Sequence, residues 1–166
     1  MQFKAGDDVV HPAHGVGHIV RLEERQLAEA ELRWYYVMTT EKGTVWVPVH
    51  SAGSIGLRTV TAKQELDQYR HLLKSRPTPL ERDHKKRRLE VNTRLKQGSF
   101  RVLCEVVRDL TAFGWHGRIG EGDAAFLTKL RDNLRREWAA AAGLSMPEAD
   151  QEVDSLLLAG REAHKL

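Results

Sequence analysis

Three histidines near the start of the chain are the first residues whose spacing suggests chemistry. His11, His14 and His18 fall within eight positions, and imidazole nitrogens are common zinc ligands. A fourth ligand is not evident beside them, and the turn-rich segment from Pro12 to Gly17 explains the histidines without a metal. We therefore expect no metal site, and a metal-dependent enzyme built on these histidines is the least favoured interpretation.

Two pairs of carboxylates are a second candidate for chemistry. Asp7-Asp8 and Glu23-Glu24 have the residue types of general acid–base catalysis, but both pairs fall at expected strand ends, where solvated charges are usual. The sequence contains no nucleotide-binding glycine motif, no cysteine-rich metal motif and no Gly-x-Ser-x-Gly elbow. We interpret the chain as a binding protein rather than an enzyme, and expect no cofactor.

A run of basic residues in the middle of the chain favours binding to an anionic partner. Arg82, Lys85, Lys86, Arg87 and Arg88 fall within seven positions. On a helix the first three share one face, whereas Arg87 and Arg88 spread charge around the axis. The cations repel one another, and phosphate oxygens relieve that repulsion. The alternative is a solvated helix face on which some arginines pair with acidic neighbours.

The charge of the whole chain is modest, but it is unevenly distributed. The 166 residues carry a net charge of +3. Residues 1–60 hold 6 Lys/Arg and 7 Asp/Glu, residues 63–101 hold 12 and 5, and residues 102–166 hold 8 and 11. The middle segment therefore has a net charge of +7, which suits contact with a phosphate backbone.

The first sixty residues show the short alternating pattern of β-strands. Apolar and aromatic runs cover 9–11, 16–22, 32–38 and 44–49, with turn residues between them. Pro48 lacks a donor for the ladder, so it is expected at a sheet edge or a strand end. Several short strands in so few residues are typical of a small Tudor- or SH3-like barrel.

From Thr61 onward the apolar period becomes helical. The spacing predicts a first helix that begins at a capping box of Thr61 and Gln64, and a second over about 80–97 that ends at Gly98. A third helix is expected to be capped by Ser99, and a fourth to cover about 123–142 and end at Gly143. A fifth is expected to begin at a capping box of Ser145 and Glu148. A glycine-broken loop over 114–122 separates the third helix from the fourth.

The expected fold is α+β, with an N-terminal Tudor/SH3-like β-barrel over residues 1–60 and an all-α bundle of four or five helices over residues 61–166. The single cysteine, Cys104, lies in an apolar helical pattern and is expected to be a buried structural thiol. No apolar run is long enough to span a bilayer, and the first residues turn polar too early for a signal peptide. We expect a cytoplasmic protein.

Three segments in the same order along nearly the whole chain carry a family resemblance. They are Phe3–Gly17 (FKAGDDVVHPAHGVG), Val47–Arg58 (VPVHSAGSIGLR) and Glu105–Leu110 (EVVRDL), the last followed by Gly122-Asp123 at the start of a helix. Together these segments resemble the CarD/CdnL family of bacterial RNA-polymerase-binding transcription regulators.

The resemblance implies two partners. The Tudor-like module would dock on the RNA polymerase β subunit, and the helical domain would contact promoter DNA near the upstream edge of the melted bubble. Cations would hold the backbone while an aromatic wedge in the minor groove keeps an unstacked step open, without reading a sequence. The resemblance thus implies a regulator that stabilises the open complex. We expect a monomer that is associated with the nucleoid through polymerase.

Two positions depart from the family pattern. By spacing from Gly98-Ser99, His84 occupies the place of the wedge tryptophan, and it either contacts a base edge or phosphate or is a solvated helix residue. Trp46 replaces a polymerase-contacting arginine of some members, and it either packs on the β subunit or belongs to the barrel core. Arg25 matches a second arginine of that surface.

The expected site residues follow from these matches and from the basic run. They are Arg25, Trp46 and Pro48 for polymerase and Arg82, His84, Lys85, Lys86, Arg87 and Arg88 for DNA. The alternative function is that of a divergent family member, a protein-interaction adaptor on polymerase with little DNA activity.

Overall fold

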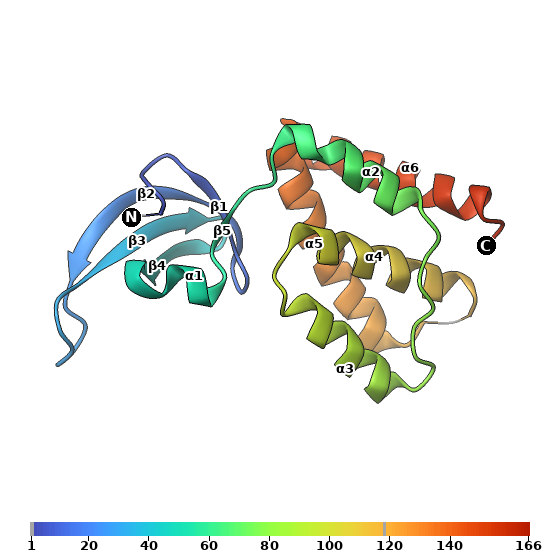
Figure 1. The fold of residues 1–166 in the computed structure, drawn as a ribbon, viewed down its shortest axis with the longest axis horizontal. Coiled ribbons are helices and arrows are strands. Elements are labelled where there is room, and N and C mark those ends of the chain that lie inside the picture. Colours follow the sequence, from blue (N-terminus) through green and yellow to red (C-terminus); the bar gives the residue numbers. More distant parts are fainter. Residues whose placement is uncertain (1, 118) are drawn as a thin grey trace. The chain divides into compact units, whose positions relative to one another are not determined.

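The chain divides into two compact units, Met1–Val60 and Thr61–Leu166. A computed structural model describes residues 2–117 and 119–166. Figure 1 shows strands in the first unit and mostly helices in the second, which confirms the α+β fold class. Arg118, which lies within the loop expected over 114–122, is outside the described residues.

The first unit is built on a five-stranded antiparallel sheet. Its strands are β1 (Asp8–His11), β2 (Gly15–Arg25), β3 (Arg33–Thr40), β4 (Gly43–Pro48) and β5 (Arg58–Thr59), in the spatial order β4-β3-β2-β1-β5. A 3-10 turn (Val49–Ser51) and the short helix α1 (Ala52–Ile55) lie between β4 and β5. The pairing leaves β4 and β5 at the two edges, and the arrangement is compatible with the expected Tudor-like barrel.

One face of this sheet holds the core of the first unit. Ile19, Tyr36, Met38 and Val47 are buried there with Phe3. The Phe3 amide donates to the Tyr36 hydroxyl at 3.1 Å, and the two rings meet edge to face with centroids 5.5 Å apart. The N-terminal segment is therefore anchored to β3.

Close approach between strands requires a glycine in β2. A Cβ on Gly17 would lie 2.4 Å from Met38 Cε and 2.8 Å from the Thr39 carbonyl oxygen.

Pro48 is the last residue of the edge strand β4, as expected for a residue without a ladder donor.

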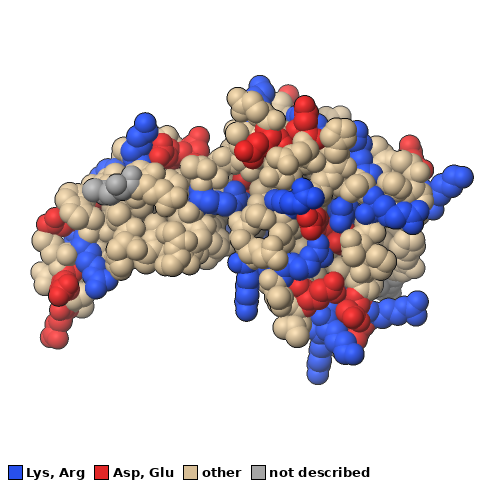
Figure 2. Space-filling model, in the orientation of Figure 1, with Lys and Arg blue, Asp and Glu red and all other residues tan. Residues whose placement is uncertain are grey.

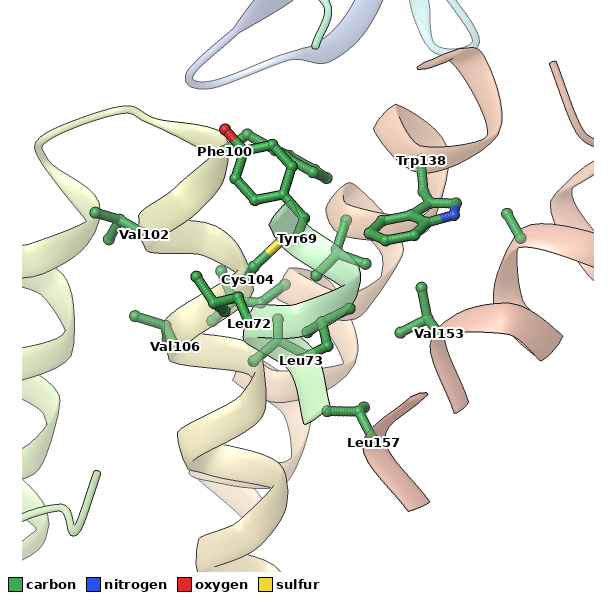
Figure 3. Packing of buried hydrophobic residues seen from close by; sticks show 14 of the residues in the cluster. Tyr69, Leu72, Leu73, Phe100, Val102, Cys104, Val106, Trp138, Val153 and Leu157 are labelled. Carbon is green, nitrogen blue, oxygen red and sulfur yellow. The ribbon is translucent and has the colours of Figure 1, made fainter. Parts of the chain in front are cut away.

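The second unit is a helical bundle. Among the residues that the structure describes it contains five α-helices, α2 (Leu66–Lys74), α3 (His84–Leu95), α4 (Phe100–Trp115), α5 (Glu121–Ala142) and α6 (Met146–Ala163). Their apolar faces meet around Tyr69, Phe100 and Trp138, drawn in Figure 3. The ring centroids of Tyr69 and Phe100 are 4.9 Å apart, and Cys104 is fully buried nearby, as predicted. No described helix is both long enough and apolar enough to span a membrane.

Several helix ends confirm the local signals in the sequence. The Ser99 hydroxyl caps α4 by accepting from the Val102 amide. Ser145 and Glu148 form both hydrogen bonds of a capping box at the start of α6. Gly143 ends α5 in the left-handed region with φ of +71°, a conformation that costs glycine little.

The starts of the first two helices of the bundle were predicted wrongly. Thr61 does not cap a helix, because its amide and hydroxyl both donate to Glu137 Oε2, at 3.1 and 2.8 Å. The helix begins at Leu66, after a 3-10 turn. The next helix starts at His84 rather than Leu80, with the Asp83 carboxylate accepting from the Lys86 amide as its cap.

Candidate functional site

The strand register places the residues predicted for polymerase contact on one face of the sheet. Residues that pair directly across neighbouring strands lie on the same face of the sheet. Across β2, β3 and β4 these residues form the rows Arg21–Val37–Trp46 and Glu23–Tyr35–Pro48, and Arg25 pairs with Arg33 in a further row on β2 and β3. The neighbouring set Leu22, Tyr36 and Val47 points into the core on the opposite face. We call the surface formed by Arg21, Glu23, Arg25, Arg33, Trp46 and Pro48 the outer sheet face.

Trp46 lies at the surface of this face and not in the barrel core. Its side chain is 38% exposed, whereas its ladder partner Val37 is fully buried. The indole Nε1–H donates to Glu23 Oε2 at 3.2 Å, and the Arg25 guanidinium carbon lies 4.8 Å from the centre of the indole ring. The core interpretation of Trp46 is therefore wrong, and the ring is held between a carboxylate and a cation.

Glu23 connects Trp46 to a second cation. Arg21 donates to the same Glu23 oxygen at 3.2 Å. The hydrogen bond from Trp46 and the proximity of the arginines hold the pKa of Glu23 below its usual range, so the carboxylate stays ionised and able to accept.

A groove lies between α3 and the start of α5 in the helical unit. It has a volume of about 580 Å³, and the residues that line it are His84, Lys85, Arg87, Arg88, Leu89, Asn92, Gly120, Gly122 and Asp123. We call it the α3–α5 groove. His84, Lys85 and Arg88, all predicted to bind DNA, are brought together there. Figure 2 shows basic side chains projecting from the part of the surface that α3 occupies in Figure 1, with acidic side chains beside them.

Arg87 is a buried structural residue and not a surface cation. It is only 6% exposed, and its Nε and Nη2 donate to Asp123 Oδ2 at 2.9 and 2.5 Å. Its Nη1 donates to the carbonyl oxygens of Glu81 and Arg82, and its guanidinium carbon lies 4.3 Å from the centre of the Phe113 ring. Because its donors are used internally, the structure corrects its assignment to DNA contact.

Asp123 also binds Arg88, which remains partly available. Arg88 Nη2 donates to Asp123 Oδ1 at 3.0 Å, its guanidinium carbon lies 4.4 Å from the centre of the Phe126 ring, and its side chain is 39% exposed. Burial alone would raise the pKa of Asp123, but hydrogen bonds from Arg87 and Arg88 outweigh it and hold the pKa below its ordinary value.

The other two predicted DNA contacts lie outside the groove lining. Arg82 precedes the helix, so it does not share a helix face with Lys85 and Lys86 as the sequence indicated. It lines a separate pocket of about 240 Å³ together with Arg76 and His116. Lys86 is exposed on α3.

Leu89 and Asn92 of α3 also line the groove, although neither is among the site residues predicted from the sequence. Leu89 is 70% exposed, the most exposed of the large apolar side chains in the described part of the chain, and Asn92 lies one turn after it. Their signal was present, because both fall outside the apolar stripe of α3 and close to Lys85 and Arg88 at helical spacing.

The N-terminal histidines are not brought together as three ligands. The rings of His11 and His14 lie with centroids 4.6 Å apart, while His18 Nδ1 lies 2.9 Å from Asp8 Oδ1. Burial, and then the nearby charge of His14, lower the pKa of His11. Within residues 2–117 and 119–166, no group of three potential ligands is placed to hold a metal ion.

Comparison with known proteins defines the class of this two-unit molecule. Residues 3–61 match the CarD-like/TRCF RID domain, and residues 69–154 match the CarD, C-terminal domain. The chain belongs to the CarD family of transcription regulators, which confirms the resemblance seen in its sequence. It is similar to the Bacillus subtilis (strain 168) protein named "Putative transcription factor YdeB", with 33% identity over 114 residues that cover 65% of this chain and 71% of that relative.

Proposed function

We propose that this transcription regulator binds the RNA polymerase β subunit through the outer sheet face and stabilises the open promoter complex through the α3–α5 groove. The contacts to DNA are to the backbone and the minor groove, and they do not read a sequence. A nucleoid-associated, cytoplasmic location follows from this proposal.

The outer sheet face has the composition of a protein-binding surface. Arg25 and the partly exposed Trp46 lie together, and arginine and tryptophan are enriched among the residues that dominate interface energies. Trp46 and Pro48 belong to an edge strand, whose unpaired backbone groups can accept a further strand. These features support docking through β4 and through the part of β2 that carries Arg25.

The α3–α5 groove has the composition of a DNA-backbone contact, and this observation carries the DNA half of the proposal. Lys85, Arg88 and His84 line it, and Lys86 is exposed on the same helix. Non-specific DNA affinity comes chiefly from such cations, because they release counterions from the phosphates.

Leu89 supplies an apolar group among these cations. Minor-groove proteins commonly insert leucine or another apolar side chain at a base step and thereby hold it partly unstacked. Leu89 is well exposed and lines the groove beside Lys85 and Arg88, so we assign the apolar part of the contact to it and leave His84 to meet a phosphate or a base edge.

The experiment that tests the proposal is the lifetime of open complexes on a promoter template, measured with and without the full chain after addition of a competitor. We expect the chain to lengthen the lifetime. An unchanged lifetime, together with retained binding to polymerase, would support the adaptor alternative instead. That alternative is favoured by one observation, the loss of Arg87 from the set of available cations.

A further inference from the structure

We propose that Glu23 is a positioning residue that fixes the indole ring of Trp46 for contact with polymerase. The inference rests on the proposed docking of the outer sheet face. No part of the sequence pattern distinguished Glu23 from its neighbour Glu24, and the distinction comes from the register of β2 against β3 and β4.

The register places Glu23 and Trp46 on the same face in adjacent rows of the sheet. Glu23 pairs with Tyr35, which pairs with Pro48, and Trp46 lies in the next row, opposite Val37. Glu24 pairs with Trp34 and belongs to the other face. Of these two adjacent acidic residues, Glu23 alone forms a hydrogen bond to the Trp46 indole, at 3.2 Å.

The indole ring is restrained from two directions. Its single N–H donates to Glu23 Oε2, and the Arg25 guanidinium lies over the ring at 4.8 Å. Glu23 itself is held by Arg21 at 3.2 Å. An aromatic side chain that is already fixed before binding loses less conformational entropy when the partner arrives, so restraint of Trp46 should increase affinity.

A direct contribution of the Glu23 charge to binding and a positioning role predict different effects when Glu23 is substituted. The outer sheet face also carries Arg21, Arg25 and Arg33, so loss of one carboxylate changes its electrostatic potential whatever residue occupies position 46. A positioning role acts only through the indole N–H, which phenylalanine lacks. A double-mutant cycle separates the two mechanisms.

The test is a titration of full-length chain onto RNA polymerase core enzyme, with Glu23→Ala, Trp46→Phe and the double variant. We expect Glu23→Ala to weaken binding about three- to fivefold, the loss of one exposed hydrogen bond to a charged group. In a chain that already carries Trp46→Phe, adding Glu23→Ala should not weaken binding further. Glu23→Gln keeps an acceptor for the indole and should restore most of the affinity.

Glu24→Ala is the matched control, since it removes the same charge from the opposite face, and it should leave affinity nearly unchanged. The proposal is overturned if Glu23→Ala has no effect, or if it weakens binding equally in the tryptophan and phenylalanine backgrounds. Failure of the docking proposal itself has another signature. In that case Arg25→Ala and Trp46→Ala would also leave polymerase affinity unchanged.

Discussion

Adjacent residues of the basic run have opposite roles. Arg87 is enclosed by Asp123, two backbone carbonyls and Phe113, whereas Lys86 next to it is exposed. The sequence predicted one cluster of cations over these positions and did not separate these roles. The partner that buries Arg87 lies 36 positions further along the chain, so no local spacing could indicate the pair.

The first prediction concerns the buried pair. Arg87→Ala should lower the free energy of unfolding of the helical unit by about 3 kcal/mol or more, because the buried carboxylate of Asp123 loses its main partner. Lys86→Ala, the matched control, should change it by no more than about 0.5 kcal/mol. Urea denaturation followed by circular dichroism measures both, and equal stability of the two variants would show that the pair contributes little.

The second prediction is a pH dependence. The folded pKa of Asp123 lies below its ordinary value of 3.8, so its stabilising contribution is complete above the unfolded pKa and is lost as the pH falls through the folded pKa. The unfolding free energy of the native chain should therefore decrease more steeply on acidification below about pH 4 than that of Asp123→Asn. Parallel profiles for the two chains would contradict this assignment.

The third prediction concerns the apolar contact to DNA. Leu89→Ala should shorten the lifetime of open complexes, because an inserted side chain is lost, whereas Leu89→Trp should lengthen it through greater stacking area. Leu158→Ala is the matched control, since Leu158 is 53% exposed on α6, away from the residues that line the groove. If only substitutions of His84 alter the lifetime, the wedge position inferred from spacing is correct and the assignment to Leu89 is wrong.

At the scale of elements, the capping patterns that predicted helix starts correctly are those whose two hydrogen-bonding residues lie within one helical turn of each other. The Ser99 cap and the Ser145–Glu148 box are such signals, and both form as predicted. The Thr61–Gln64 box has the same sequence pattern, but Glu137, 76 positions away, binds Thr61 instead. A tertiary contact thus replaced a local cap, which helix-capping rules alone do not anticipate.

The fourth prediction tests the packing of α2 on α6. A Cβ on Gly160 would lie 2.9 Å from the Lys74 carbonyl oxygen, so the two helices could not keep their present distance. Alanine is a better helix former than glycine by about 1 kcal/mol, but the clash is with backbone, and Gly160→Ala should destabilise the unit by about 1–3 kcal/mol. Thermal unfolding measures the change, and a raised midpoint would show that the helices separate at little cost.

At the scale of the whole molecule, the sequence predicted the fold class, the family and the basic character of the middle segment. The count of +7 overstates the charge available for DNA, however. Arg70, Arg87, Arg88, Arg94 and Arg101 each bind a carboxylate that belongs to residues 102–166. The acidic residues of that last segment thus neutralise some of the basic residues of the middle segment. Only the folded bundle reveals which cations are left for DNA.

The central claim is that the cations left at the groove and on α3 hold promoter DNA. It is tested most directly by the salt dependence of the chain's effect on open complexes. The concentration that half-maximally extends the lifetime is measured over a salt series for the native chain and for Lys85→Ala/Lys86→Ala/Arg88→Ala. A matched variant, Lys63→Ala/Lys74→Ala/Lys165→Ala, removes the same formal charge from exposed positions outside the groove.

We predict weaker action of the first variant and a logarithmic salt slope reduced by about 2–3, close to 0.9 for each lost phosphate contact. The matched variant should retain the native slope. Equal slopes for the native chain and the first variant would contradict the claim that the cations of α3 and the α3–α5 groove hold promoter DNA.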